Sequence, residues 1–363
     1  MDLLSTTIDL NAIAHNVRLI KARVAPAQLM CVVKADGYNH GAAEVARVMV
    51  ENGADQLGVA TLAEAHALAD AHLPAPILAW IWSPEQHFRA ALAAGISLGI
   101  PSMAHARAVA DAGVRATVAV KVDTGLNRSG VPEAHWRECF ELLASSPVQV
   151  TGLFSHLACA DDPDDPTTDA QAAAFERALD LARQCGLEVP VNHLANSPAT
   201  LTRPDLHYQM VRPGLICYGL EPIRGRDHGL KPALTWSARL TLVKAIAAGE
   251  GTSYGLTWWA PHDGNYAIVP VGYADGLPRA AQGRLEVAIN GKRYPQVGRV
   301  CMDQIVVWLG QDTAAPGDEA ILFGAGGMSA TELADATGTI NYEVACWPKG
   351  RTVRHYIGGH NES

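Results

Sequence analysis

The amino-acid sequence predicts an α/β chain with an N-terminal (β/α)₈ barrel of the TIM type and a C-terminal, mainly β domain. Between residues 29 and 217, eight short apolar runs alternate with alanine-rich amphipathic stretches, which is the pattern of a parallel barrel. After about residue 230 this alternation gives way to strands separated by turn signals. We therefore expect the barrel over residues 1–229 and the β domain over residues 230–363.

The barrel strands are expected in the apolar runs LMCVVK, LGVAT, PILAW, SLGI, TVAVKVDT, VTGLFSH, VNHLA and MVRPGLICYG. The clearest helical periodicity between them lies in GAAEVARVMVENG, TLAEAHALADA, EAHWRECFELLAS and TDAQAAAFERALDLARQCG. A doubly wound parallel sheet is the structural alternative. It is disfavoured because no GxGxxG follows the first run.

The β domain is expected to contain strands in WSARLTLVKAIAA, YAIVPVGYA, RLEVAINGKRYPQVG, QIVVWLG and EAILFG. Asn290-Gly291 stands between two alternating runs and predicts a hairpin with a type I′ turn. One short helix is expected in SATELADATG.

Composition excludes several classes of protein. The 28 Lys and Arg residues against 37 Asp and Glu residues give a net charge of −9, which argues against nucleic acid or an anionic membrane as the main partner. The seven cysteines are scattered and never spaced as CxxC, so neither a disulfide framework nor a metal cluster is expected. No signal peptide or membrane span is recognisable, and we expect a cytoplasmic protein.

Lys34 is the first candidate for chemistry, because it closes the run LMCVVK. The carboxyl ends of barrel strands form the mouth where such barrels catalyse reactions. A lysine that is desolvated there can lose its proton and form a Schiff base with a carbonyl compound. The structural alternative is a strand-end lysine that extends into solvent, so Lys34 alone is weak evidence.

Polar side chains are also expected at the carboxyl ends of four other strands. Each has a structural alternative, as a cap or a hydrogen-bonded core histidine. Their convergence on one rim above apolar strands indicates a site. The residues concerned are Lys121, Asp123, Arg128, His156, His193, Asn196, Ser197, Arg212 and Gly214.

The last two of these strands suggest a phosphate site. Barrels commonly bind phosphate at the loops after strands seven and eight, and here those loops carry Ser197 and Gly214. The chain has no GxxxxGK[ST], so a nucleoside triphosphate is disfavoured. A small phosphorylated aldehyde accounts for both the lysine and the phosphate site, which predicts pyridoxal 5′-phosphate as the cofactor.

The motifs of this chain resemble those of the bacterial alanine racemases. VVKADGYNHG is similar to that family's cofactor-lysine motif, and further blocks follow in the family's order from about residue 8 to 346. SYGLTW and GRVCMDQ in the β domain are specific to racemases. The other blocks are KVDTGLNRSG, GLFSHLACAD, NSPAT, VRPGLICYGL, PVGYADGLPR and NYEV.

The resemblance implies a racemase that interconverts L- and D-alanine by two-base proton transfer and supplies D-alanine for peptidoglycan. Lys34 would carry the cofactor as a Schiff base and act on one face of the substrate's α-carbon, and Tyr254 would act on the opposite face. Arg212 would face the pyridine nitrogen and, as a permanent cation, would leave it unprotonated. That arrangement favours simple reprotonation over transamination.

The resemblance also implies the remaining site residues and the assembly. The phosphate contacts would be Tyr38, Ser197, Gly214 and Tyr342, with His156 and Asn196 also in the cofactor site. Arg128 and the backbone of Met302 would hold the substrate carboxylate, and Tyr273 and Asp303 would line the entrance. A homodimer with shared active sites is implied, in which each β domain covers the partner's barrel.

Lys121 matches a position where some family members carry a carbamylated lysine, and a plain Lys121–Asp123 pair is the alternative. Asp36, Gly37 and Asn39 replace residues that are commonly Asn, Ala and Gly in the family. The C-terminal stretch that begins at Trp347 matches the family less well and has no assigned role.

Two other functions stay open at the level of sequence. A racemase of serine or of broader specificity would differ in only a few pocket residues. A fold-related pyridoxal-phosphate decarboxylase would use a Cys-Asp pair in its second domain, and Cys301 and Asp303 resemble such a pair weakly. Met302 and the motif that contains Tyr254 argue against a decarboxylase. A non-catalytic cofactor-carrying protein would have no use for a second base in a separate domain.

Overall fold

The computed structural model describes residues 2–359 and divides the chain into two compact units. The barrel unit consists of Ile13–Cys217 with Glu221–Leu230. The β unit consists of the described residues up to Ala12, Tyr218–Leu220 and residues 231–359. Each unit has its own sheet.

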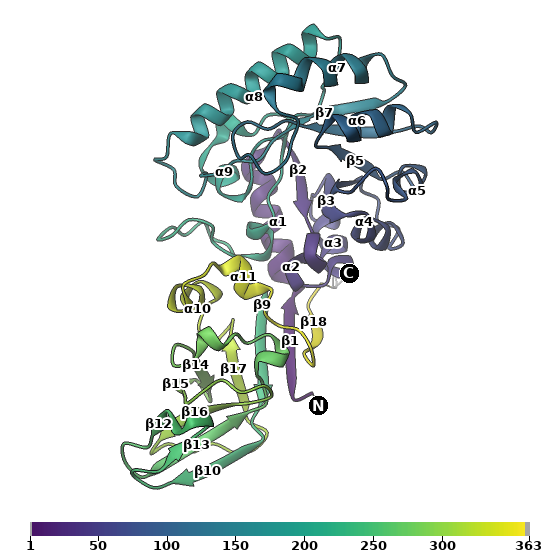
Figure 1. The fold of residues 1–363 in the computed structure, drawn as a ribbon. Helices are drawn as coiled ribbons and strands as arrows, with labels where there is room; N and C mark the ends of the chain where they lie inside the picture. The colour runs from purple at the N-terminus through teal and green to yellow at the C-terminus, as the bar shows by residue number, and fades with distance from the viewer. Residues whose placement is uncertain (1, 360–363) are drawn as a thin grey trace. The chain divides into compact units, whose positions relative to one another are not determined.

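The barrel unit contains a curled sheet of seven parallel strands in the order β7-β6-β5-β4-β3-β2-β8. Figure 1 shows its helices outside this sheet. The strands are β2 (Gln28–Val32), β3 (Gln56–Thr61), β4 (Ile77–Ile81), β5 (Ser97–Ile100), β6 (Thr117–Lys121), β7 (Gln149–Phe154) and β8 (Met210–Val211). The helices are α1 (Leu10–Val24), α2 (Lys34–Asn39), α3 (Ala42–Glu51), α4 (Leu62–Ala69), α5 (Phe88–Ala93), α6 (Met103–Ala110), α7 (Trp136–Ala144), α8 (Thr167–Gln184) and α9 (Ser197–Thr202), with 3₁₀ turns η1 (Glu133–His135), η2 (Pro204–Leu206) and η3 (Leu215–Tyr218).

Residues 191–195 take the place of the seventh barrel strand, although their pairing is too irregular to form a regular ladder. On one side, the amides of Val191 and His193 donate to the Thr151 and Leu153 carbonyls of β7 at 2.9 and 3.1 Å. On the other side, the Arg212 amide donates to the Ala195 carbonyl at 2.9 Å. Because β8 also pairs with β2, the eight segments form a closed barrel, and the predicted fold class is confirmed.

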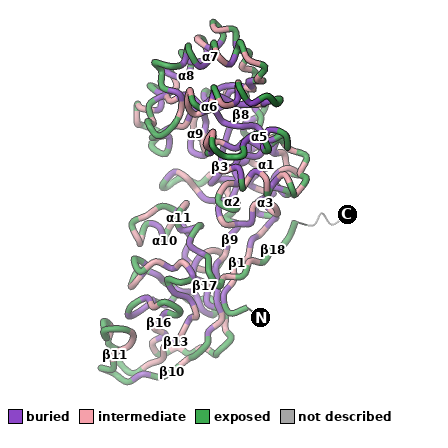
Figure 2. The backbone as a smooth tube through the Cα atoms, turned by 45° about the vertical axis from the view of Figure 1, so that its right-hand side comes forward, coloured by how far each residue is buried: buried purple, intermediate pink, exposed green. Residues whose placement is uncertain are grey.

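The barrel is filled by apolar side chains from alternate strands, as a layered barrel interior requires. Met30, Leu78, Ala119 and Met210 come from β2, β4, β6 and β8, and all are almost fully buried. A Cβ at Gly58 would lie 2.8 Å from the Trp80 indole and one at Gly99 would lie 2.9 Å from the Trp80 Cβ atom, so these glycines make room for Trp80. A buried Met or Leu side chain contributes about 1.5–3 kcal/mol, and Figure 2 colours β8 as buried.

The four helical patterns singled out in the sequence are α3, α4, η1 with α7, and α8. At the start of α4, the Thr61 hydroxyl accepts the Glu64 amide while the Glu64 carboxylate accepts the Thr61 amide. This reciprocal cap satisfies two amides that the helix itself leaves without partners. It fixes the chain where it leaves β3.

The β unit contains a nine-stranded sheet in the order β10-β13-β16-β15-β14-β17-β9-β1-β18 and a small hairpin, β11-β12. Its strands are β1 (Leu4–Asp9), β9 (Leu234–Arg239), β10 (Leu242–Ile246), β11 (Gly251–Thr252), β12 (Trp258–Trp259), β13 (Gly264–Val269), β14 (Glu286–Ile289), β15 (Lys292–Val297), β16 (Ile305–Gly310), β17 (Glu319–Phe323) and β18 (Val353–Ile357). Its helices are α10 (Ala330–Thr337) and α11 (Asn341–Ala345), with 3₁₀ turns η4 (Tyr254–Leu256), η5 (Tyr273–Asp275) and η6 (Arg279–Ala281).

Two local predictions in this unit are confirmed. Asn290 and Gly291 have φ values of 50° and 79°, and Ile289 pairs with Lys292, which is a two-residue type I′ hairpin. The predicted short helix is α10, which Ser329 caps at its start.

The N-terminus differs from the sequence-based division, which assigned residues 1–229 to the barrel. Strand β1 pairs antiparallel with β9 and parallel with β18, so it belongs to the sheet of the β unit. Its residues are alternately buried and half-buried. This alternation suits a sheet with one covered face rather than a barrel strand, which is apolar on both faces.

Within residues 2–359, no helix is long and apolar enough to cross a membrane. All seven cysteines are free thiols. Cys31 and Cys217 are both buried, with their Sγ atoms 3.7 Å apart.

Candidate active site

The chain makes a left-handed turn directly after Lys34. Residues 35–38 have φ values between 52° and 64°, a conformation that costs about 1–2 kcal/mol per non-glycine residue. Side chains hold the turn in place, since Glu64 accepts the Ala35 amide at 2.7 Å and Asp36 accepts the Ala42 amide at 2.8 Å. Strain of this kind concentrates at functional sites. Here it places the Tyr38 ring centre 5.8 Å from the Lys34 Nζ atom.

Tyr38 meets the loops after the seventh and eighth barrel segments. The Gly214 amide donates to Ser197 Oγ at 3.1 Å. A Cβ at Gly214 would lie 2.2 Å from the Tyr38 hydroxyl, so only glycine permits this approach. Asn196 caps α9 by accepting the Ala199 amide. The three barrel residues predicted to contact phosphate are therefore close together, and we call Tyr38, Ser197 and Gly214 the cradle.

If the cradle holds the phosphate of pyridoxal 5′-phosphate, as the sequence predicts, Gly214→Ala should weaken binding of that compound by at least tenfold, because the added methyl group must displace the Tyr38 ring from the cradle. Titration of the purified apoprotein with pyridoxal 5′-phosphate measures the affinity, and thermal unfolding measures the stability. In the Gly214→Ala/Tyr38→Leu double variant, the clash is relieved, so stability should recover while affinity stays low. Wild-type affinity in Gly214→Ala would contradict this assignment of the cradle.

Arg212 is buried and donates in several directions. Nη1 donates to Nδ1 of His193 at 2.7 Å, and Nη2 donates to the Ser155 carbonyl at 2.5 Å and to Nδ1 of His156 at 3.3 Å. Phe154 supports the group, because the guanidinium lies 5.3 Å from its ring centre and the His193 ring stacks on it. Burial lowers the pKa of Arg212 to about 10. The group is therefore still a cation at neutral pH.

The two histidines beside Arg212 are neutral. Burial, with the nearby charges of Arg212 and Arg128, lowers the pKa of His156 to about 3. Burial and Arg212 also hold the pKa of His193 well below its usual range. Because arginine only donates, each Nδ1 that faces it is an acceptor, and the ring proton is on Nε2. Arg212 is thus the fixed cation of this part of the site.

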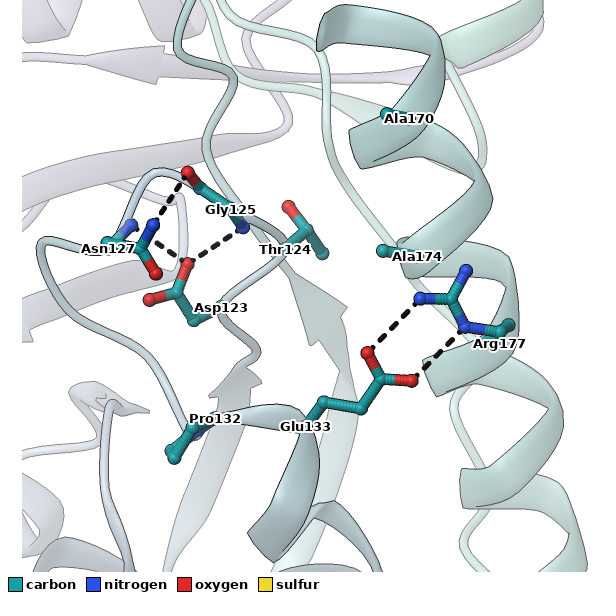
Figure 3. A pocket seen from close by; sticks show the side chains of 9 residues that line it. All are labelled: Asp123, Thr124, Gly125, Asn127, Pro132, Glu133, Ala170, Ala174 and Arg177. Carbon is teal, nitrogen blue, oxygen red and sulfur yellow. Dashed lines mark hydrogen bonds and ion pairs between the residues drawn. The ribbon is translucent and has the colours of Figure 1, made fainter.

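Lys121 and Arg128 lie at the two ends of the loop after β6. The Asp123 carboxylate accepts the Gly125 and Asn127 amides at 3.0 and 3.1 Å, which folds the loop back (Figure 3). The Lys121 ammonium is buried and donates to Ser129 Oγ. Burial, together with the charges of Arg212 and Arg128, lowers the pKa of Lys121 to about 8.

A polar hollow of about 330 Å³ lies beside this loop. Figure 3 shows Asp123 on one side of it and the ion pair of Glu133 with Arg177 on the other. Nε and Nη2 of Arg177 donate to the two carboxylate oxygens of Glu133 at 3.1 Å each. The pair links η1 to α8.

In the β unit, Tyr254 and Tyr273 line one hollow of about 470 Å³ together with Arg279, Arg299 and Cys301. Tyr254 is 71% exposed, Tyr273 43% and Met302 51%. The Tyr273 amide donates to the Cys301 carbonyl at 3.1 Å, which joins the Tyr273 turn to the segment of Met302 and Asp303. Tyr342 lies on α11 and is half-buried.

The structure thus gathers the predicted site residues other than Tyr342 into one set in each unit. The barrel set holds Lys34, Tyr38, Lys121, Arg128, His156, Asn196, Ser197, Arg212 and Gly214. The β set holds Tyr254, Tyr273, Met302 and Asp303. Two supporting residues received no role from sequence. His193 stood among the polar residues of the rim, and Glu64 had a local signal, since it lies three residues after Thr61 as in a capping box.

A closed parallel barrel with these polar strand ends, followed by a β unit that presents tyrosines, agrees with the class that the sequence motifs predicted, an amino-acid racemase, which is an isomerase. Comparisons with known proteins identify the family. Residues 8–222 match the family "Alanine racemase, N-terminal domain", and residues 233–356 match "Alanine racemase, C-terminal domain". The chain belongs to the alanine racemase family.

Curated relatives and solved structures agree with this family. The alanine racemase of Corynebacterium efficiens is 62% identical over 99% of both chains, and that of Corynebacterium glutamicum strain R is 57% identical over 98% of this chain and all of the relative. The crystal structure of the C. glutamicum alanine racemase has a TM-score of 0.91 at 52% identity, and covers 98% of this chain and 100% of that chain. The alanine racemase structure from Streptomyces lavendulae has a TM-score of 0.96 at 41% identity, and covers 99% of this chain and 98% of that chain.

Proposed function

We propose that this enzyme interconverts L-alanine and D-alanine with pyridoxal 5′-phosphate held by Lys34. The observation that carries the proposal is the cradle of Tyr38, Ser197 and Gly214 beside the strand-end lysine. The 62% identical relative from C. efficiens is an alanine racemase, which supports alanine as the substrate. The proposed role is the supply of D-alanine for peptidoglycan in the cytoplasm, where the seven free thiols would stay reduced.

The residues present fit the cofactor. Gly214 has no Cβ, which would otherwise fill the cradle. The hydroxyl groups of Tyr38 and Ser197 would bind the phosphate, and Tyr342 is proposed as a further phosphate contact. Arg212 is the buried cation proposed to face the pyridine nitrogen, with His156 and Asn196 nearby. When bound, the cofactor supplies an electron sink that acidifies the substrate's α-hydrogen.

The chain's own groups would then move one proton. The Lys34 amine would take or return it on one face of the α-carbon, and the Tyr254 hydroxyl would do so on the other. Arg212 keeps its protons, because it is a cation at neutral pH and its neighbours His156 and His193 are neutral. A site without a carboxylate opposite the pyridine nitrogen favours reprotonation over transamination. Arg128 and the Met302 backbone would hold the substrate carboxylate, with Tyr273 and Asp303 at the entrance.

The proposal is tested by borohydride reduction followed by peptide mapping, together with a chiral assay on alanine and serine. We expect the reduced cofactor on Lys34 and racemisation of alanine in preference to serine. Lys34→Ala should carry no label and lose at least a thousandfold in rate. The exposed Lys244 of β10 supplies the control, because Lys244→Ala should behave as wild type. A label on another lysine would refute the site.

We further propose that Lys121 is carbamylated. Its amine is buried among the cations Arg212 and Arg128, and an added carboxylate would offset their charge. Only the neutral amine reacts with carbon dioxide. Because the pKa of Lys121 is lowered to about 8, the neutral fraction rises steeply from pH 7 to pH 9.

Carbamylation of Lys121 should therefore increase with pH. We expect intact-mass analysis in bicarbonate buffer to show one added carbon dioxide, with greater occupancy at pH 9 than at pH 7. The Lys121→Ala variant should lack this mass at every pH. An unmodified wild-type chain at pH 9 would favour the plain Lys121–Asp123 pair instead.

We propose a homodimer in which each active site is shared. Tyr254, Tyr273 and Met302 are exposed in the β unit, and Leu256 and Trp259 beside Tyr254 are 47% and 56% exposed. Apolar surface that gathers around proposed catalytic groups is typical of an interface. A two-fold arrangement closes on itself and leaves no further site for growth.

A further inference from the structure

A buried carboxylate holds the turn that carries Tyr273. Asp275 is fully buried at the end of η5, and its two oxygens accept Nε and Nη2 of Arg351 at 2.8 and 2.7 Å. It also accepts the Gly272 amide at 3.1 Å. A buried charge is tolerated when it is paired and hydrogen-bonded in this way. Arg351 belongs to the C-terminal stretch to which the sequence assigned no role.

Arg351 also reaches the segment that carries Met302. Its Nη1 donates to Oδ1 of Asp303 at 2.8 Å, on the exposed side of the guanidinium. A planar guanidinium presents donors in two directions at fixed angles. Nε and Nη2 of the guanidinium therefore pair with Asp275, while Nη1 pairs with Asp303. A lysine ammonium on a flexible stem is a single point of charge and does not reproduce both contacts.

The backbones of the same segments touch one another. The Ala274 amide donates to the Met302 carbonyl at 3.1 Å, and the Lys349 amide donates to the Asp275 carbonyl at 2.9 Å. A Cβ at Gly272 would lie 2.2 Å from the Met302 carbonyl oxygen, and one at Gly350 would lie 2.6 Å from that of Ala274. Residues 272–276, 301–303 and 349–351 therefore pack together, and the Asp275–Arg351–Asp303 bridge links them by charge.

We propose that Arg351 is a positioning residue for substrate recognition. Through the Asp275–Arg351–Asp303 bridge it fixes the Met302 backbone and the Asp303 carboxylate against the Tyr273 turn. The inference rests on the proposed function, which assigns Met302 to the substrate carboxylate and Tyr273 and Asp303 to the entrance. When the Met302–Asp303 segment is fixed, the proposed substrate-binding site stays small. Arg351 therefore governs the affinity for substrate and the preference for alanine over the larger serine.

Arg351→Lys tests this with the least risk to folding, because an ammonium can still pair with Asp275. We expect the KM for L-alanine to rise about tenfold while kcat changes less than about twofold, which is the signature of lost binding rather than lost chemistry. The ratio of kcat/KM for alanine to that for serine should fall. Arg293→Lys is the matched control, since Arg293 forms an ion pair with Glu332 in the same unit and should leave all three quantities unchanged.

A double-mutant cycle separates positioning from general loss of structure. If Arg351 acts through Asp303, Arg351→Lys in an Asp303→Asn background should raise the KM little further. Amide hydrogen exchange adds a measurement that needs neither cofactor nor activity. Peptides over residues 270–277 and 299–305 of the Arg351→Lys apoprotein should exchange faster than in wild type, and those of Arg293→Lys should not.

Fully additive effects on the KM, a fall in kcat with an unchanged KM, or unchanged exchange in both peptides would each overturn the inference. A failure of the proposed function is distinguishable from these outcomes. A wild-type chain that racemises no amino acid removes the proposed function and the recognition role together. Exchange in the two peptides then still decides whether Arg351 holds the segments.

Discussion

Tyr254→Phe should abolish racemisation while cofactor binding survives. The change removes one hydroxyl group and keeps the ring. A positioned general acid or base contributes about 10²–10⁴-fold to a rate, so we expect the racemisation rate to fall by at least that factor. Lys34 remains in place, so the absorbance of the bound cofactor should match that of the wild type.

Tyr254→Phe should also treat the two enantiomers of alanine differently. If Lys34 and Tyr254 serve opposite faces of the α-carbon, the variant retains one of the two bases. In deuterium oxide it should exchange the α-hydrogen of one alanine enantiomer without inverting it. The other enantiomer should keep its hydrogen. Proton NMR of the α-position measures both rates in one experiment.

A second tyrosine of the β unit provides the control for the loss of a phenol hydroxyl group. Tyr266 of β13 lies in the same unit and outside both site sets, so Tyr266→Phe should leave the rates unchanged. Tyr254 is 71% exposed in its own unit, so the variant should fold as stably as wild type. Undiminished racemisation by Tyr254→Phe would end the two-base proposal, and equal exchange from both enantiomers would assign both faces to Lys34.

The barrel could be predicted from sequence because each strand is a short apolar run and most runs are separated by amphipathic helical stretches. Residues 191–195 were found as a strand even though they form no regular ladder, since the run VNHLA has the same pattern as the others. The N-terminal strand β1 was not assigned to the β unit. Its partners β9 and β18 lie about 230 and 350 residues further along the chain, and local periodicity carries no signal of pairing at that distance.

Candidate site residues could be predicted where the proposed chemistry requires a residue type, and could not be predicted where only the three-dimensional geometry determines the role of the residue. Lys34, Ser197 and Gly214 stand at strand ends, where the barrel collects them at one rim. The left-handed turn after Lys34 had no such signal, because Ala35 and Asp36 adopt positive φ only when contacts such as that from Glu64 hold them. Arg351 lies 48 residues from Asp303 and 76 from Asp275, so its role becomes visible only in three dimensions.

Mixing two inactive chains should restore activity if the active sites are shared. In a dimer of Lys34→Ala with Tyr254→Phe, one site would combine the intact Lys34 of one chain with the intact Tyr254 of the other. The second site would lack both groups. With random reassortment, half of the dimers are mixed and each has one working site of two, so about a quarter of wild-type activity should return. If instead both groups come from a single chain, no mixed dimer contains a complete site.

Subunit exchange must be shown in the same sample, which native mass spectrometry of a tagged and an untagged chain provides. The matched control mixes Lys34→Ala with the Lys34→Ala/Tyr254→Phe double variant, whose mixed dimers contain no Lys34 and should stay inactive. Activity in the first mixture alone supports the shared site, because the two mixtures differ only in whether an intact Lys34 can meet an intact Tyr254 from another chain. Demonstrated exchange without recovered activity would mean that Tyr254 serves the barrel of its own chain.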